Sequence, residues 1–128
     1  MDRRRLLPLL LPVLLLAGGC AEARETATTV RDCASLAADV ARAGLAGVPT
    51  QAEAEAAAQR LDDRVQDLES TTVRDAATGL RDRLRELADA ARDGDATAVR
   101  DATDAARDAA TQAAEACGVP AEQFLGGA

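Results

Sequence analysis

Apolar residues recur at helical spacing along residues 26–116, in four stretches separated by polar or glycine-containing breaks. Positions i, i+3, i+4 and i+7 lie on one face of an α-helix, so each stretch predicts an amphipathic helix with one buried side. A β-sheet is not indicated, because the chain has one Phe, no Tyr, no Trp and only scattered Val. The pattern predicts an all-α domain.

The first predicted helix covers residues 26–43 and ends at Gly44. A capping box begins the second helix, since the Thr50 oxygen can accept an early backbone N–H while Glu53 reaches back to the Thr50 N–H. This second helix runs to about Glu69. The expected buried faces are Val30, Cys33, Leu36, Ala37 and Val40 in the first helix, and Ala54, Ala57, Ala58, Leu61, Val65 and Leu68 in the second.

The third predicted helix covers residues 72–92 and follows a turn at residues 70–72, where the side chains are of N-cap type and the apolar stripe changes phase. Gly94 ends this helix, and Asp95 caps a fourth helix that runs to about Ala116. The expected buried faces are Val73, Ala77, Leu80, Leu84, Leu87 and Ala91 in the third helix, and Val99, Ala102, Ala106, Ala109 and Ala113 in the fourth.

Four helices of similar length with short connections predict an antiparallel up-down four-helix bundle, with one further turn over residues 120–125. In the alternative, the second and third helices form one long central helix, and the two shorter helices pack on its opposite halves. The alanine-rich fourth helix favours the compact bundle, because it needs neighbours on two sides to bury enough apolar surface.

Residues 1–20 have a different pattern from the rest of the chain. Arg3, Arg4 and Arg5 precede an apolar run, Leu6–Leu16, which is shorter than the roughly 20 residues of a spanning helix. Small residues follow, and the segment ends at Cys20. A cationic start, a short apolar core and small residues at its end predict an export signal.

The residues Gly18, Gly19 and Cys20 resemble the end of the lipobox of bacterial lipoproteins, although Ala17 stands where leucine is commoner. In that family the cysteine takes a diacylglyceryl group and becomes the new N-terminus. The resemblance covers the first 20 residues and implies a signal peptide over residues 1–19 and a lipidated tether over 20–25. The apolar pattern makes residues 26–128 the helical bundle domain. The resemblance places that domain on the extracytoplasmic face of the cell membrane, attached through the lipid on Cys20. The alternative is an ordinary secretory signal, cut near Ala17 to Ala21.

The basic residues are all arginine, and alanine makes up about a quarter of the chain. This bias indicates a high-GC genome. Together with the lipobox, the sequence is therefore similar to small helical lipoproteins of high-GC Gram-positive bacteria.

Two cysteines remain besides Cys20, namely Cys33 and Cys117. An even pair in an exported chain predicts a disulfide. The bridge would close a loop of about 85 residues, for which the chain-entropy model gives roughly 4.5 kcal/mol of stabilisation. Two buried free thiols are the alternative.

The charge and composition exclude several classes of function. Removing Asp2 and three arginines from the totals of 15 basic and 22 acidic residues gives residues 20–128 a net charge of −9. Such a domain is not expected to bind nucleic acid, which requires a basic surface. There is no His or Lys and no glycine-rich phosphate loop. We therefore expect no enzyme activity, no cofactor and no metal site, and the acidic residues 62–69 and 101–115 are interpreted as solvated helix faces.

Three functions remain compatible with the sequence. The first is an interaction domain that binds a protein partner of the cell envelope, with Leu45 and Val48 in an exposed apolar connection as the candidate contact residues. The alternative is that these two residues cap the core. The second is a structural spacer of the cell envelope, which needs no pocket. The third is a small-ligand-binding helical bundle, which would need an apolar cavity.

Overall fold

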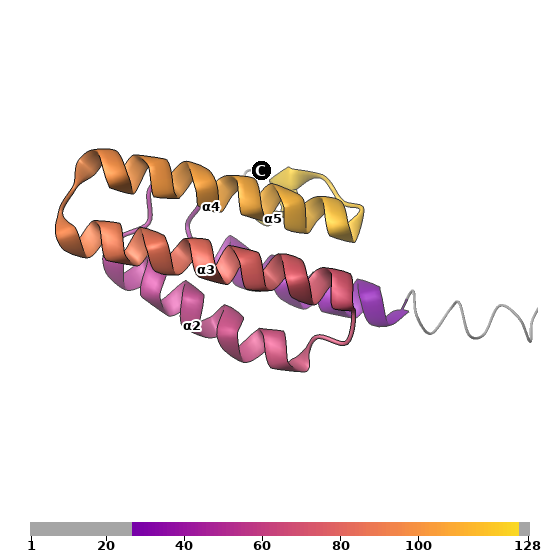
Figure 1. Cartoon of the computed structure of the whole chain (residues 1–128). Helices are drawn as coiled ribbons and strands as arrows, with labels where there is room; N and C mark the ends of the chain where they lie inside the picture. Colours follow the sequence, from indigo (N-terminus) through magenta and orange to yellow (C-terminus); the bar gives the residue numbers. More distant parts are fainter. Residues whose placement is uncertain (1–26, 126–128) are drawn as a thin grey trace, which may run out of the picture.

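Local capping residues set the helix boundaries in residues 27–125, the part of the chain that the computed structural model describes (Figure 1). The first helix covers residues 27–41, and α2 covers Gln51–Asp67. The predicted capping box begins α2: the Glu53 N–H donates to Thr50 Oγ1 and the Thr50 N–H donates to Glu53 Oε1, each over 3.2 Å. Two of the otherwise unpaired groups at the helix start are thereby satisfied.

A break separates α2 from α3 (Thr71–Asp93), where the sequence predicts a turn. Leu68 is extended, with ψ 126°, and buries its side chain. The cap of α3 is Ser70, whose Oγ accepts the Val73 N–H over 3.4 Å. The alternative of one long central helix is therefore wrong, because the backbone leaves the helical conformation at Leu68.

The third connection is a tight turn between α3 and α4 (Ala96–Cys117). Gly94 has a φ of 72°, a left-handed conformation that glycine adopts without a Cβ clash. Asp95 Oδ1 then accepts the N–H groups of Thr97 and Ala98 over 3.0 and 3.1 Å, which caps α4. After α4 the chain turns back into a short helix, α5 (Ala121–Leu125), as expected for residues 120–125.

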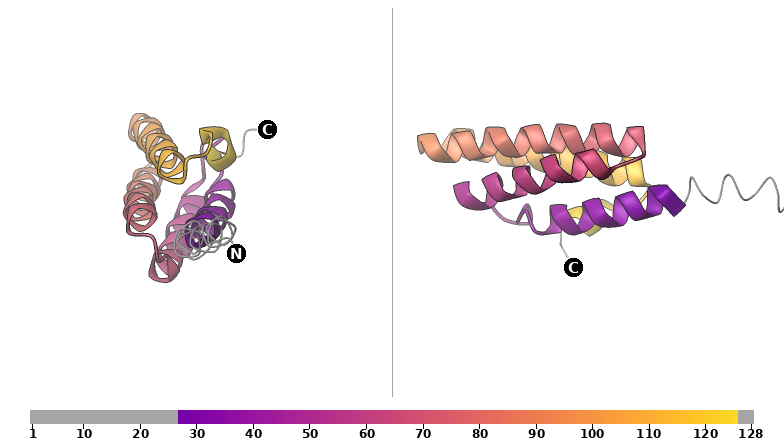
Figure 2. Two further views of the ribbon diagram at one scale, coloured as in Figure 1. Left: turned by 90° about the vertical axis from the view of Figure 1, so that its right-hand side faces the viewer. Right: turned by 90° about the horizontal axis from the view of Figure 1, so that it is seen from below.

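The five helices within residues 27–125 pack into an all-α bundle, which confirms the predicted fold class. The four long helices alternate in direction (Figure 1). Seen along the bundle, α4, α3, α2 and the first helix follow one another around the core, and α5 lies between α4 and the first helix (Figure 2). The short α5 therefore fills the opening between the two ends of the row.

The core consists of large side chains on the first helix and α3, packed against small ones on α2 and α4. Leu80, Leu84 and Leu87 of α3 are fully buried, with no exposed area. The fourth helix buries mostly alanine, and its inward face contains the predicted residues but is wider than predicted. Its buried residues are Thr103, Ala106, Ala109, Ala110, Ala113 and Ala114, whereas Val99 and Ala102 are half-buried. No helix in the described range is long and apolar enough to cross a membrane.

Two aspartates of the first helix are almost completely buried, and each holds a different part of the bundle. Asp32 Oδ2 accepts the backbone N–H groups of Glu69 and Ser70 over 3.0 and 2.9 Å. Asp39 Oδ2 accepts a hydrogen bond from Arg64 Nε of α2 over 2.8 Å. Asp32 thus fixes the α2–α3 connection to the first helix, because a carboxylate makes strong hydrogen bonds to backbone donors.

We expect Asp32→Ala to lower the free energy of unfolding by about 3 kcal/mol, because two backbone N–H groups lose a charged acceptor. Urea denaturation of the variant and the parent protein measures the change. Asp108→Ala is the matched control, since Asp108 is exposed in the middle of α4 and its loss should change the stability by less than about 0.5 kcal/mol. Equal effects of the two substitutions would contradict the role of Asp32.

Candidate binding site at the disulfide end of the bundle

The structure brings Cys33 and Cys117 together, as the sequence analysis expected. Their Sγ atoms are 2.09 Å apart and their Cα atoms 5.8 Å apart, which is disulfide geometry. The two residues meet because α4 runs antiparallel to the first helix, so that the end of α4 lies beside the start of the first helix (Figure 1). The third cysteine, Cys20, lies outside the described residues.

An apolar pocket of about 220 Å³ adjoins the disulfide. One wall is a face of the first helix, formed by Thr29, Val30, Cys33, Ala34 and Ala37. Val30 was expected in the core, but 61% of its surface is exposed, so that part of the prediction is wrong. The face of the first helix that carries Val30 extends past the end of the core, where it borders the pocket.

The opposite wall of the pocket comes from the C-terminal part of the described chain, and it consists of Cys117, Val119, Gln123 and Phe124. The turn after α4 produces this wall: the Val119 N–H donates to Ala114 O over 3.0 Å, and the chain then reverses into α5. Phe124 is fully buried. The sequence predicts the turn over residues 120–125 that contains Phe124, but it does not predict the pocket, which exists only because α5 lies against the first helix.

The pocket has no acidic or basic side chain in its lining, and Thr29 and Gln123 are its polar members. An uncharged lining of this kind accepts an apolar group and offers no charge to hold an ion. It also contains no nucleophile–base pair. The arrangement is suited to binding an apolar ligand.

The two residues proposed as a contact surface, Leu45 and Val48, have different environments. Leu45 belongs to the core with 1% exposure, so its expected place on the surface is wrong. Arg107 of α4 fixes this connection, because its Nε donates to Leu45 O over 2.7 Å and its Nη2 donates to Gly47 O over 2.8 Å. Val48 is 62% exposed, as expected for a contact residue.

Val48 borders an open groove of about 360 Å³ at the end of the bundle away from the disulfide. Its other lining residues are Ala91, Gly94, Ala96, Val99 and Arg100, from the tip formed by α3 and α4. The groove exists because α3 and α4 continue beyond the C-terminal end of the first helix (Figure 1). It is more open to solvent than the pocket at the disulfide, and its lining includes the charged Arg100.

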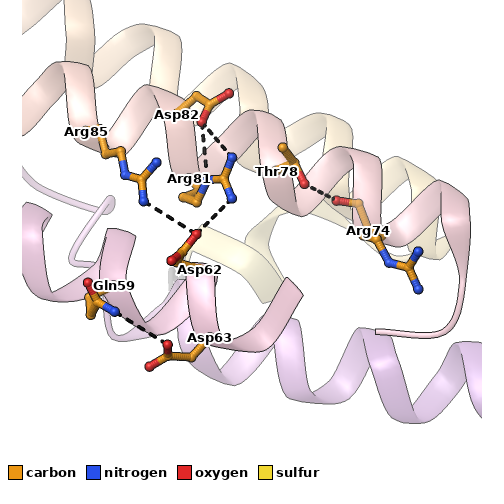
Figure 3. Close-up of polar contacts among 8 residues, drawn as sticks. All are labelled: Gln59, Asp62, Asp63, Arg74, Thr78, Arg81, Asp82 and Arg85. Carbon is orange, nitrogen blue, oxygen red and sulfur yellow. Dashed lines mark hydrogen bonds and ion pairs between the residues drawn. The ribbon is translucent and has the colours of Figure 1, made fainter. Parts of the chain in front are cut away.

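Ion pairs join α2 to α3 along their polar faces (Figure 3). Arg81 Nη1 donates to Asp62 Oδ1 over 2.9 Å, and Arg85 Nη2 lies 3.4 Å from the same oxygen. The sequence predicts a solvated helix face for the acidic residues 62–69. The ion pairs of Asp62 with two arginines agree with that prediction. Within residues 27–125, no three His, Cys, Asp or Glu side chains are grouped so as to hold a metal ion.

Other polar contacts of α2 shift the pKa of their members. Hydrogen bonds from Gln51 and from Arg92 lower the pKa of Glu55 below its ordinary value. The stabilisation that the ionised Glu55 provides is therefore present at neutral pH and is lost as the pH falls through its lowered pKa. The hydrogen bond to Asp39 raises the pKa of the Arg64 guanidinium, which stays charged at every ordinary pH.

Leu45 and Val48 lie in the same connection but differ in burial, so substitutions at the two positions test the described structure. We expect Leu45→Ala to lower the free energy of unfolding by about 2–5 kcal/mol, because a fully buried leucine leaves a cavity. Val48→Ala should change it by less than about 0.5 kcal/mol, since that side chain is exposed. Chemical denaturation of both variants measures the difference, and a large loss in Val48→Ala would contradict the described position of this residue.

Comparisons of the sequence with protein-family models and with curated proteins, and of the structure with solved structures, gave no match.

Proposed function

We propose that this protein is an exported lipoprotein, held by a lipid on Cys20 at the extracytoplasmic face of the cell membrane, and that its helical bundle acts in binding and not in catalysis. The sequence of residues 1–20 supports the anchor, because a cationic start, a short apolar core and Gly18-Gly19-Cys20 have the order found in lipoprotein signals. Because residues 20–128 are acidic, an anionic bilayer would repel them, so the lipid supplies the attachment.

The observation that carries this proposal is the arrangement of the three cysteines. Cys33 and Cys117 are 84 positions apart in the sequence and lie at disulfide distance. Disulfides persist in oxidising compartments and are rare in the cytosol of most organisms. The remaining cysteine is the one that ends the signal-like segment, so each cysteine has a role that fits export.

The apolar pocket beside the disulfide favours binding of a small apolar ligand over a purely structural spacer. A spacer needs no pocket, whereas this one has about 220 Å³ with an uncharged lining. A protein partner of the envelope is the second candidate, and it is favoured by the exposed Val48 and the groove of about 360 Å³ beside it.

The anchor is tested by the intact mass of the full-length protein extracted from membranes of the producing bacterium, before and after reduction. We expect a mass that lacks residues 1–19 and includes acyl chains on Cys20, followed by a gain of two hydrogen atoms when the Cys33–Cys117 bridge is reduced. The Cys33→Ser, Cys117→Ser double variant should lose the response to reduction and keep the acyl chains.

Cys20→Ser is the variant that separates lipidation from the bridge. It should abolish acylation and release the protein from the membrane, while the gain of two hydrogens on reduction remains. An unprocessed chain with three free thiols in the soluble fraction would contradict the proposal.

A further inference from the structure

The apolar pocket at the disulfide differs from the groove at Val48 and from the groove between α2 and α3 in the chemistry of its lining. Its lining has no charged side chain, whereas the groove at Val48 includes Arg100 and the groove between α2 and α3 includes Glu55 and Arg92. Val30 at its edge is also one of two large hydrophobic residues in residues 27–125 that remain exposed, the other being Val48. The pocket therefore has the chemistry of a site for hydrocarbon.

The size of the pocket limits what it can hold. An engineered apolar cavity of about 150 Å³ accepts one benzene molecule, so the volume of about 220 Å³ corresponds to roughly eight or nine carbon atoms. That is less than a drug-sized ligand requires. It fits the end of a single acyl chain, which is narrow and has no polar atoms to satisfy.

The position of the pocket indicates where such a chain would come from. Thr29 and Val30 belong to its lining and lie near the beginning of the described chain. Residue 27, the first described residue of the first helix, follows Cys20 by seven positions, which an extended backbone spans in at most about 25 Å. An acyl chain on Cys20 is thus within reach of the pocket without any movement of the helices.

We propose that the pocket between the first helix and α5 binds the end of one acyl chain carried on Cys20 of the same molecule. This inference rests on the proposed lipidation of Cys20. It adds a second role for that lipid, because a chain that enters the pocket is withdrawn from the bilayer. Two acyl chains anchor a protein stably and one chain only marginally, so the occupied pocket weakens the attachment to the membrane.

Whether the pocket binds hydrocarbon is tested first without the lipid. The full chain carrying Cys20→Ser is titrated with octanol. We expect saturable one-to-one binding that shifts the backbone amide NMR signals of Val30, Val119 and Phe124. Affinity should rise from butanol to octanol and change less than threefold from octanol to dodecanol, because the pocket is then full. Absence of saturable binding would overturn the proposal.

Ala34→Trp is the blocking variant, because Ala34 lines the pocket from an exposed position on the first helix. Added to Cys20→Ser, it should weaken octanol binding at least tenfold. Ala56→Trp is the matched control, since Ala56 is exposed on α2 and is not part of the lining. Circular dichroism of both variants verifies the helical fold, and equal octanol affinities in the two would overturn the assignment of the site.

The source of the bound acyl chain is tested in the lipidated protein. The protein is produced in cells that are fed a fatty acid with a photoreactive diazirine near its end. After illumination, we expect crosslinks from the acyl chain on Cys20 to peptides of the first helix and α5, lost in Ala34→Trp and kept in Ala56→Trp. Crosslinks from free phospholipid alone would overturn the assignment to Cys20. If the intact mass shows no acyl chain, the proposed anchor fails, while the octanol titration still decides whether the pocket binds hydrocarbon.

Discussion

The packing of one leucine-rich helix against alanine-rich neighbours is the constraint on which the rest of the bundle depends. Leu80, Leu84 and Leu87 of α3 have no exposed area, and the inward faces of α2 and α4 consist mostly of alanine. Small side chains let helices approach closely, so the leucines fill the space that the alanines leave. Without large residues on α3, the flanking helices would have little apolar surface to bury.

The same constraint explains why the ends of the bundle are open while its middle is dense. The first helix ends at residue 41, short of the tip formed by α3 and α4 (Figure 1), and its last apolar contacts come from the connection that contains Leu45. Beyond that point α3 and α4 continue with α2 but without the first helix, and the groove at Val48 lies at the tip of α3 and α4. At the other end, α5 and Phe124 close the space between α4 and the first helix incompletely, and the apolar pocket remains beside the disulfide.

Polar side chains add specificity that an alanine-rich core cannot provide by itself, because small apolar surfaces pack in several registers at similar cost. Asp32 receives two backbone hydrogen bonds from the α2–α3 connection, and Arg107 donates two to carbonyl oxygens of the connection after the first helix. Each contact joins segments that are far apart in the sequence. They fix the positions of the connections, and the Cys33–Cys117 bridge fixes the first helix to the end of α4.

The sequence by itself determined the helices, most of their starting points and the pairing of Cys33 with Cys117. These features depend on local signals: the Thr50–Glu53 capping box, the left-handed Gly94 and an even number of cysteines after Cys20. Asp32 and Asp39 lie seven positions apart on one helix face beside the apolar stripe, but their spacing does not distinguish buried acids from solvated ones. Their burial is a result of the tertiary structure.

Only the tertiary structure decided which apolar residues are buried at the ends of the bundle. Val30 and Leu45 belong to equally apolar segments, yet Val30 is exposed and Leu45 is not. The difference arises because burial depends on whether another helix extends over the residue, and helical periodicity contains no information about the lengths and offsets of neighbouring helices. The inward face of α4 and the pocket between α5 and the first helix have the same origin: both are set by contacts between segments distant in the sequence.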